Sequence, residues 1–211
     1  MSCTQLLKRK RGACGSPFVV TKRMPGLETI LGIHTNADGS FVITNQDNKI
    51  IVVSQNFTYM HSVIGGANTH FAGYIDGDWS TSTFNRPSGV ATDRKGNVLV
   101  IDKNNNSIRQ IYKDSGRATT LAGCGQPGFH NAQTRLASFK GPEDVVVLLD
   151  GSLVLSDTGN HCLRVVSLNG NVRTLCGDGE AGFLDGVGDA AKFDHPIGLA
   201  VTRDGNVLVI S

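Results

Sequence analysis

The sequence predicts an all-β chain, a β-propeller built from repeated units of four short antiparallel strands. Three observations lead to this fold. The 211 residues include 26 glycines and only 6% aromatic residues, which suits short strands joined by tight turns. A turn followed by an apolar strand occurs four times, at spacings of 57, 55 and 54 residues. No stretch of useful length has the periodicity of an amphipathic helix.

The repeat is aligned on the turn glycines Gly39, Gly96, Gly151 and Gly205, which precede SFVIT, NVLVI, SLVLS and NVLVI. Twelve residues before three of these glycines stand Phe84, Phe139 and Phe193. In the second copy, apolar segments predict strands around 89–93, 97–102, 107–112 and 118–123. Four strands in a unit of this period are typical of a propeller blade.

A polar corner follows the second strand of each unit. Six residues after the glycine come Asn45, Asp102 and Asp157, and nine residues after come Asn48, Asn105 and Asn160. Short Asp and Asn side chains bond to nearby backbone and close turns. We therefore predict a structural role for Asp102, Asn105, Asp157, Asn160 and the neighbouring His161. Thirteen residues after the glycine, the same count aligns Val52, Arg109 and Arg164.

Two segments carry a family resemblance. PSGVATDRKGNVLVIDKNNNSIR (87–109) and PEDVVVLLDGSLVLSDTGNHCLR (142–164) resemble the NHL repeat, whose Asn-His-Leu corner is similar to Asn160, His161 and Leu163. The resemblance implies about three and a half to four NHL-type blades. The chain departs from the family pattern at Asn45, which replaces the corner Asp, and at Asp144, which replaces a glycine.

We predict a basic N-terminal tail over residues 1–25 and a propeller over 26–211. Its units are 26–84, 85–139, 140–193 and an incomplete 194–211. Since NHL propellers generally have about six blades, two alternatives stay open. The chain is a fragment of a longer propeller, or it is a small ring in which a strand at 16–22 completes the last blade. The uncovered final strand favours the fragment.

Charge and cysteine usage point to an intracellular protein. The net charge is +2, but the first 23 residues carry six basic residues and no acidic ones, so the remainder is 2 − 6 = −4. Lys8, Arg9, Lys10 and Arg11 form either a nuclear-import signal, a contact for an anionic surface or a solvated tail. The five cysteines are loosely spaced and predict reduced thiols. We expect a cytoplasmic location, no secretory signal and no membrane span.

No pattern in the chain predicts chemistry. It has no G-x-S-x-G elbow, P-loop or H-E-x-x-H segment, and its six histidines occupy different positions of the repeats. The acidic residues in GDGEAGFLDGVGD fit a recurring structural loop better than a calcium site. We therefore predict no catalytic residue, no metal, no cofactor and no enzymatic activity. Some six-bladed propellers that resemble this fold are calcium-dependent lactonases or zinc-dependent lyases, but none of their site residues can be matched here by motif.

The NHL resemblance implies a non-catalytic platform that docks a protein partner of unknown identity. Candidate contacts are the connector residues Trp79, Gln126, Phe129 and Phe183. A metal-dependent hydrolase or lyase is one alternative. RNA binding is another, although the net negative charge of the repeats disfavours nucleic acid. In similar proteins such a propeller accompanies a further domain in the full-length product.

Overall fold

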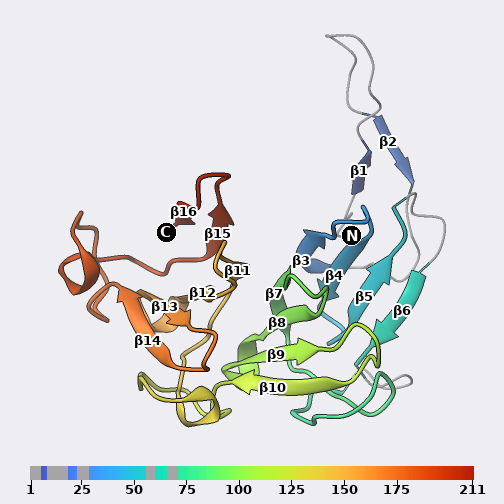
Figure 1. The fold of residues 1–211 in the computed structure, drawn as a ribbon, viewed down its shortest axis with the longest axis horizontal. Coiled ribbons are helices and arrows are strands. Elements are labelled where there is room, and N and C mark those ends of the chain that lie inside the picture. The colour runs from blue at the N-terminus through green and yellow to red at the C-terminus, as the bar shows by residue number, and fades with distance from the viewer. Residues whose placement is uncertain (1–5, 9–18, 23–28, 56–59, 66–70) are drawn as a thin grey trace.

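The computed structural model describes residues 6–8, 19–22, 29–55, 60–65 and 71–211. It confirms the predicted all-β propeller fold: three four-stranded antiparallel sheets and one two-stranded sheet follow one another along an open arc (Figure 1). In each four-stranded sheet the strands pair in chain order, as in a propeller blade.

The strands have the following bounds. The first blade contains β3 (Ile30–Thr35), β4 (Phe41–Asn45), β5 (Ile50–Val53) and β6 (Met60–Ile64). The second contains β7 (Pro87–Thr92), β8 (Val98–Asp102), β9 (Ser107–Ile111) and β10 (Ala118–Ala122). The third contains β11 (Val145–Val147), β12 (Leu153–Asp157), β13 (Cys162–Val166) and β14 (Val172–Cys176), and the fourth contains β15 (Gly198–Val201) and β16 (Val207–Ile210). Single 3-10 turns lie at Lys103–Asn105, Thr134–Leu136, Thr158–Asn160 and Gly188–Ala190.

The first strand of each blade lies on the inner side of the arc. β3 contacts β7, β7 contacts β11 and β11 contacts β15, while β6, β10 and β14 lie toward the outer rim (Figure 1). Side-chain hydroxyls link neighbouring blades here. Thr44 Oγ1 donates to the Ser88 carbonyl at 2.6 Å, and Ser88 Oγ donates to the Glu143 carbonyl at 2.7 Å. These bonds join β4 of the first blade to β7, and β7 to the segment that leads into β11.

The hydrophobic core lies between blades rather than inside one blade. Val42 and Ile50 of the first blade pack with Phe84, Val90 and Val98 around the second. A matching cluster joins the second and third blades through residues that include Leu99, Ile101, Phe139, Leu153 and Leu155. Both faces of a middle blade are therefore buried, which explains why its strands read as nearly continuous apolar runs.

The connectors between blades cover the outer strands. The Ala118 N–H of β10 donates to the Gly77 carbonyl at 2.7 Å, and the Val172 N–H of β14 donates to the Ala132 carbonyl at 2.8 Å. Each connector thus extends along the outer edge of the blade that it leads into. This contact satisfies backbone groups that an edge strand would otherwise leave open to pairing with another chain.

A buried arginine holds the corner of the third blade. Arg164 Nη1 donates to Asp157 Oδ2 at 2.8 Å and to the Ser138 carbonyl at 3.1 Å. Its Nη2 donates to the His130 carbonyl at 3.0 Å and to Asn131 Oδ1 at 2.7 Å. The side chains of Arg164 and Asp157 have no solvent exposure. One guanidinium therefore connects the second strand, the third strand and the preceding connector.

The second blade repeats this arrangement. Arg109 Nη1 donates to Asp102 Oδ2 at 2.8 Å, and its Nη2 donates to Asp76 Oδ1 at 3.0 Å. Asn105 Nδ2 donates to the same Asp102 carboxylate at 2.8 Å, as Asn160 does to Asp157 at 2.9 Å. The recurring Asp and Asn of the sequence pattern are thus acceptor and donor within one buried network.

The first blade lacks this arginine. Ile43 pairs with Ile51 in its sheet, whereas the equivalent Val100 and Leu155 pair with Arg109 and Arg164. The corner of the first blade is therefore one residue shorter than the others. The sequence alignment that placed Val52 opposite the two arginines was wrong by one residue, because it assumed corners of equal length.

Near the N-terminus, β1 (Leu6–Lys8) pairs with β2 (Val19–Lys22) in a separate two-stranded sheet. Among the described residues β2 therefore pairs with β1 and not with β16, and residues 16–18 lie outside the described part of the chain. The basic residues Arg9 to Arg11 also lie outside it. No helix in the described part has the length and hydrophobicity of a membrane span.

We predict that Arg164→Ala lowers the free energy of unfolding by about 3–5 kcal/mol, because the Asp157 carboxylate would stay buried without its counter-charge. Urea-induced unfolding measures this change. Arg173→Ala, at an exposed position of β14, is the control and should change stability by no more than about 0.5 kcal/mol. Equal effects of the two substitutions would contradict the role assigned to Arg164.

Candidate functional site

A hydrogen bond from backbone to corner side chain closes each of the three joints between blades. The Arg86 N–H donates to Asn48 Oδ1 at 2.6 Å. The Gly141 N–H donates to Asn106 Oδ1 at 2.8 Å. At the third joint the His195 N–H faces His161 Nδ1 at 3.3 Å. The corner of one blade thus holds the segment that enters the next, and at one joint histidine replaces asparagine.

Both sides of this contact have left-handed backbone. The corner residues Asn48, Asn106 and His161 have φ values of 60°, 46° and 50°, and Arg86 and His195 both have φ of 53°. Asparagine tolerates this conformation better than most residues, but histidine is also enriched there. The left-handed backbone therefore sets the direction in which the Cα–Cβ bonds of His161 and His195 leave the chain.

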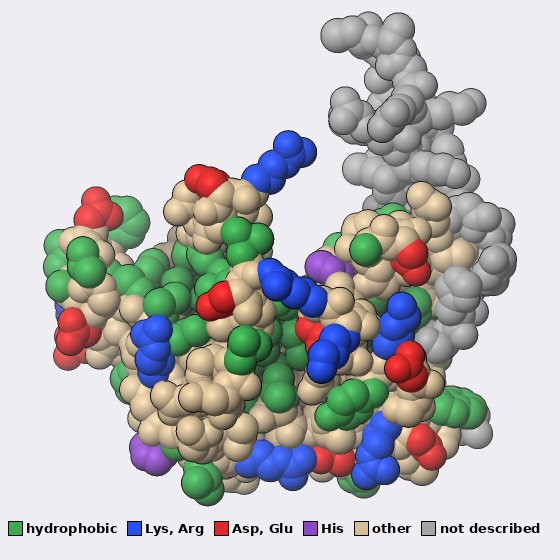
Figure 2. All heavy atoms as spheres, in the orientation of Figure 1, with side chains coloured by type: hydrophobic (Ala, Val, Ile, Leu, Met, Phe, Trp, Pro, Cys, Tyr) green, Lys and Arg blue, Asp and Glu red, His purple; other side chains and the backbone are tan. Residues whose placement is uncertain are grey.

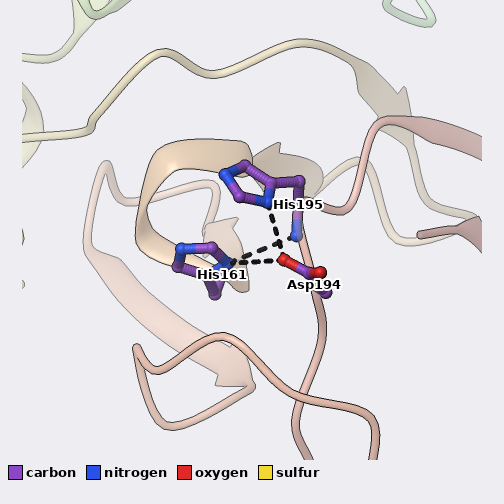
Figure 3. A group of neighbouring side chains, drawn as sticks. All are labelled: His161, Asp194 and His195. Carbon is purple, nitrogen blue, oxygen red and sulfur yellow. Dashed lines mark hydrogen bonds and ion pairs between the residues drawn. The ribbon is translucent and has the colours of Figure 1, made fainter.

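Three potential metal ligands meet at the third joint (Figure 3). His195 Nδ1 lies 2.7 Å from Asp194 Oδ1, and His161 Nδ1 lies 3.7 Å from the same oxygen. The two imidazole rings approach edge-to-face with centroids 4.3 Å apart. One ligand atom from each residue lies within 4.8 Å of the others.

The electrostatics of this group suit a cation. The His195 N–H donates to the lone pair of His161 Nδ1, so a cation would bind His161 through Nε2 or by displacing this contact. Asp194 supplies a carboxylate whose side chain is 64% exposed, while the His161 side chain is only 16% exposed. Two imidazoles and one carboxylate fit zinc and other divalent transition metals. The partly open position leaves room for a water or a substrate.

The equivalent positions at the other two joints do not combine two histidines with an aspartate. Asp194 is the counterpart of Asn85 and Lys140, since each follows the repeated phenylalanine. The N–H groups of Asn85 and Lys140 donate to the corner carboxylates at 2.7 Å, and the Asp194 N–H faces the Ser211 hydroxyl at 3.4 Å. In the same register, His195 replaces Arg86 and Gly141, and His161 replaces Asn48 and Asn106. Asp194 and His195 therefore differ from their counterparts at the other two joints, whereas His161 is the histidine that the Asn-His-Leu corner of the NHL repeat carries.

The predicted contact residues lie in three successive connectors and do not form one site. Trp79 precedes the second blade, Gln126 and Phe129 precede the third, and Phe183 precedes the fourth. The Phe129 ring lies 5.1 Å from the Arg164 guanidinium carbon and so belongs to the corner network. Phe183 is 91% exposed and Trp79 is 54% exposed.

The sequence analysis missed the cluster because it compared only residues that occupy the same position in successive repeat units. His161 lies in the corner of the third unit, and His195 lies in the segment that leads into the first strand of the fourth. The structure brings these two positions together at every joint. Comparing the corner of each unit with the entry of the next would have shown Asn48 with Arg86, Asn106 with Gly141, and His161 with His195.

Comparison with known proteins identifies the repeats. The family model described as NHL repeat matches residues 84–111 and 139–166, which cover most of the second and third blades. These blades are NHL repeats. Human NHL repeat-containing protein 2 is 36% identical over 135 residues, which are 61% of this chain and 19% of that protein. The Arabidopsis thaliana protein SUPPRESSOR OF QUENCHING 1, chloroplastic is 30% identical over 190 residues, which are 82% of this chain and 18% of that protein. The chain thus spans about a fifth of the length of these curated relatives.

Solved structures share the fold at low sequence identity. A Bacteroides thetaiotaomicron protein of unknown function is 18% identical with a TM-score of 0.69 over 85% of this chain and 44% of its own. A gluconolactonase from Xanthomonas campestris has a TM-score of 0.54 at 16% identity, over 82% of this chain and 50% of its own. Virginiamycin B lyase from Staphylococcus aureus has a TM-score of 0.53 at 13% identity, over 89% of this chain and 57% of its own.

These neighbours correct the prediction that the protein is not an enzyme. That prediction was wrong, because it relied on the absence of short catalytic motifs from a repeat protein. A lyase and a lactonase have the same propeller architecture, so the fold gives no reason to exclude catalysis. Residues from separate blades can also meet where no contiguous motif reveals it, as His161 and His195 do.

We predict that His161→Asn leaves stability nearly unchanged, because asparagine closes the other two joints and tolerates the left-handed backbone. His161→Ala should lower the free energy of unfolding by about 1 kcal/mol, since the His195 N–H loses its acceptor. Thermal and urea unfolding of both variants test this. Two variants of equal stability would show that the joint does not depend on this hydrogen bond.

Proposed function

We propose that this chain is the propeller portion of a metal-dependent hydrolase or lyase, with the metal held by His161, Asp194 and His195. The observation that carries the proposal is the convergence of three ligand-type side chains at one joint. The repeat itself needs none of them, because Asn, Lys, Arg and Gly serve the same structural positions elsewhere. His161 is also the histidine of the family's corner, so the two residues that the repeat leaves unexplained are Asp194 and His195, and both lie against His161.

The donor set indicates what such a site does. Two imidazole nitrogens and one carboxylate oxygen leave coordination positions open on a divalent transition metal. A metal bound there supplies Lewis acidity, which polarises a carbonyl group or lowers the pKa of a bound water. His161 is anchored through its turn and is the most buried of the three, so it provides the preorganised ligand. Asp194 and His195 enter from the connector and complete the set.

The enzymes of similar fold support this proposal at the level of reaction class. The neighbours named as a gluconolactonase and a virginiamycin B lyase show that propellers of this architecture serve both kinds of chemistry. Because the chain spans about a fifth of its curated relatives, other segments of the full-length protein could complete the substrate site. A protein partner and a cytoplasmic location stay predictions.

We predict that the purified chain binds one equivalent of Zn²⁺ or Mn²⁺ in isothermal titration calorimetry. Combined substitution with the residues of the other joints, His161→Asn, Asp194→Asn and His195→Arg, should weaken binding by at least about tenfold, since it removes all three ligands. His130→Asn changes an exposed histidine outside the cluster and is the matched control. Unchanged binding by the triple variant would overturn the site.

We further predict metal-dependent turnover in a panel of lactones and activated esters. The triple variant should lose that activity while keeping the melting temperature of the parent chain, because its substitutions are native to the repeat. Stoichiometric metal binding without turnover of any substrate by the full-length protein would retain the metal site and reject the enzymatic proposal.

A further inference from the structure

A second candidate site lies at the opposite ends of the strands, between the first and second blades. A cavity of about 670 Å³ opens there among the turns at residues 36–40, 93–96 and 112–116. Its floor is formed by apolar side chains that include Val42, Val52, Val98 and Ile111. We call this cavity, together with the residues that line it, the turn-face groove. It shares no residue with the cluster at His161.

Two aromatic side chains stand at the rim of the turn-face groove. Trp79 is 54% exposed and Tyr112 is 41% exposed. Five residues before the repeated phenylalanine, the later connectors have Thr134 and Gly188 in place of Trp79. Directly after the third strand, the other blades have Ser54 and Ser167 in place of Tyr112. Both rings are therefore additions to the repeat at this joint, and the fold does not require them.

Charge at the rim also departs from the repeat. Lys95 occupies the turn position where the other three copies carry Asp38, Asp150 and Asp204. Arg94 and Lys113 flank the same opening. Arg109 and Arg164 each form an ion pair with a buried aspartate. Among the described residues, by contrast, Arg94, Lys95 and Lys113 have no carboxylate oxygen within ion-pair distance. Figure 2 shows Lys and Arg side chains interspersed with acidic and hydrophobic ones on the side of the arc where the second blade lies.

The two acids of the rim are engaged in their own turns. Asp38 Oδ1 accepts from the Ser40 N–H at 2.9 Å and from Ser40 Oγ at 2.6 Å, and these bonds lower the pKa of Asp38. Asp93 Oδ1 accepts from the N–H groups of Lys95 and Asn97 at 2.9 and 2.8 Å. Both carboxylates stay in place as fixed negative charges. Three cations and two carboxylates leave a net charge of 3 − 2 = +1.

We propose that the turn-face groove docks an extended peptide of a protein partner, with a bulky apolar side chain on the floor and an adjacent acidic residue at Lys95. The apolar floor and the exposed indole match the chemistry of a hydrophobic anchor. The surplus of one positive charge suits a peptide with an isolated carboxylate. A nucleic acid fits less well, because its phosphates would follow one another past Asp38 and Asp93.

Fluorescence anisotropy with labelled decapeptides tests the proposal. The probe carries one Phe flanked by Glu, and a second peptide replaces each Glu with Lys. We expect the Glu peptide to bind at least about tenfold more tightly, and increasing salt to weaken it. Trp79→Thr and Lys95→Asp, which introduce residues found at the same positions of other repeats, should each weaken binding by about fivefold or more. Phe183→Ala, in another connector, should leave it unchanged.

Several outcomes would overturn the proposal. Equal affinity for the Glu and Lys peptides removes the charge argument, and wild-type binding by Trp79→Thr removes the anchor. No detectable binding of the Glu peptide rejects the groove as a peptide site. A single-stranded RNA decamer that binds more tightly and is lost in the same variants would assign the groove to nucleic acid instead. Melting temperatures of the variants show whether any loss reflects unfolding.

Discussion

The buried aspartate–arginine pair of the second and third blades is the interaction on which the arrangement of the chain depends. Removing two such charges from water costs several kcal/mol for each ion. The cost is offset because the Arg164 guanidinium meets a carboxylate, two backbone carbonyls and an amide oxygen. These acceptors come from β12 and the preceding connector. The pair therefore fixes where the corner turns and how the connector lies against the blade.

Rigid corners explain how a chain with so many turns positions side chains accurately. Each corner ends in a left-handed residue whose side chain accepts a backbone N–H of the next blade. Asn48 holds such a joint in the first blade as well, where the apolar Ile51 replaces the arginine. The joint therefore forms above a buried Asp–Arg pair in two blades and where Asn45 and Ile51 take their places in the first blade.

The sequence predicts the strands and the corners well because both repeat. The segments expected at 97–102 and 118–123 form β8 (Val98–Asp102) and β10 (Ala118–Ala122). The shorter first corner was misaligned because a count of residues cannot detect a deletion inside a turn. The pair His161 and His195 was missed for another reason. These residues lie 34 positions apart in different units, and only packing between blades brings them together.

Function in such a chain is best sought where a copy departs from the repeat without a structural need. The repeat accepts Asn or the family's His at the corner, Asn or Lys after the phenylalanine, and Arg or Gly before the proline. The third joint has His161, Asp194 and His195 at these places, and their side chains meet. The first joint has Trp79, Tyr112 and Lys95 where small or acidic residues serve elsewhere, and these surround a cavity. Residues that differ from their counterparts in other repeat units would seldom lie together if such differences were distributed at random. The two groups lie at opposite ends of the strands, and each is the basis of a separate binding proposal.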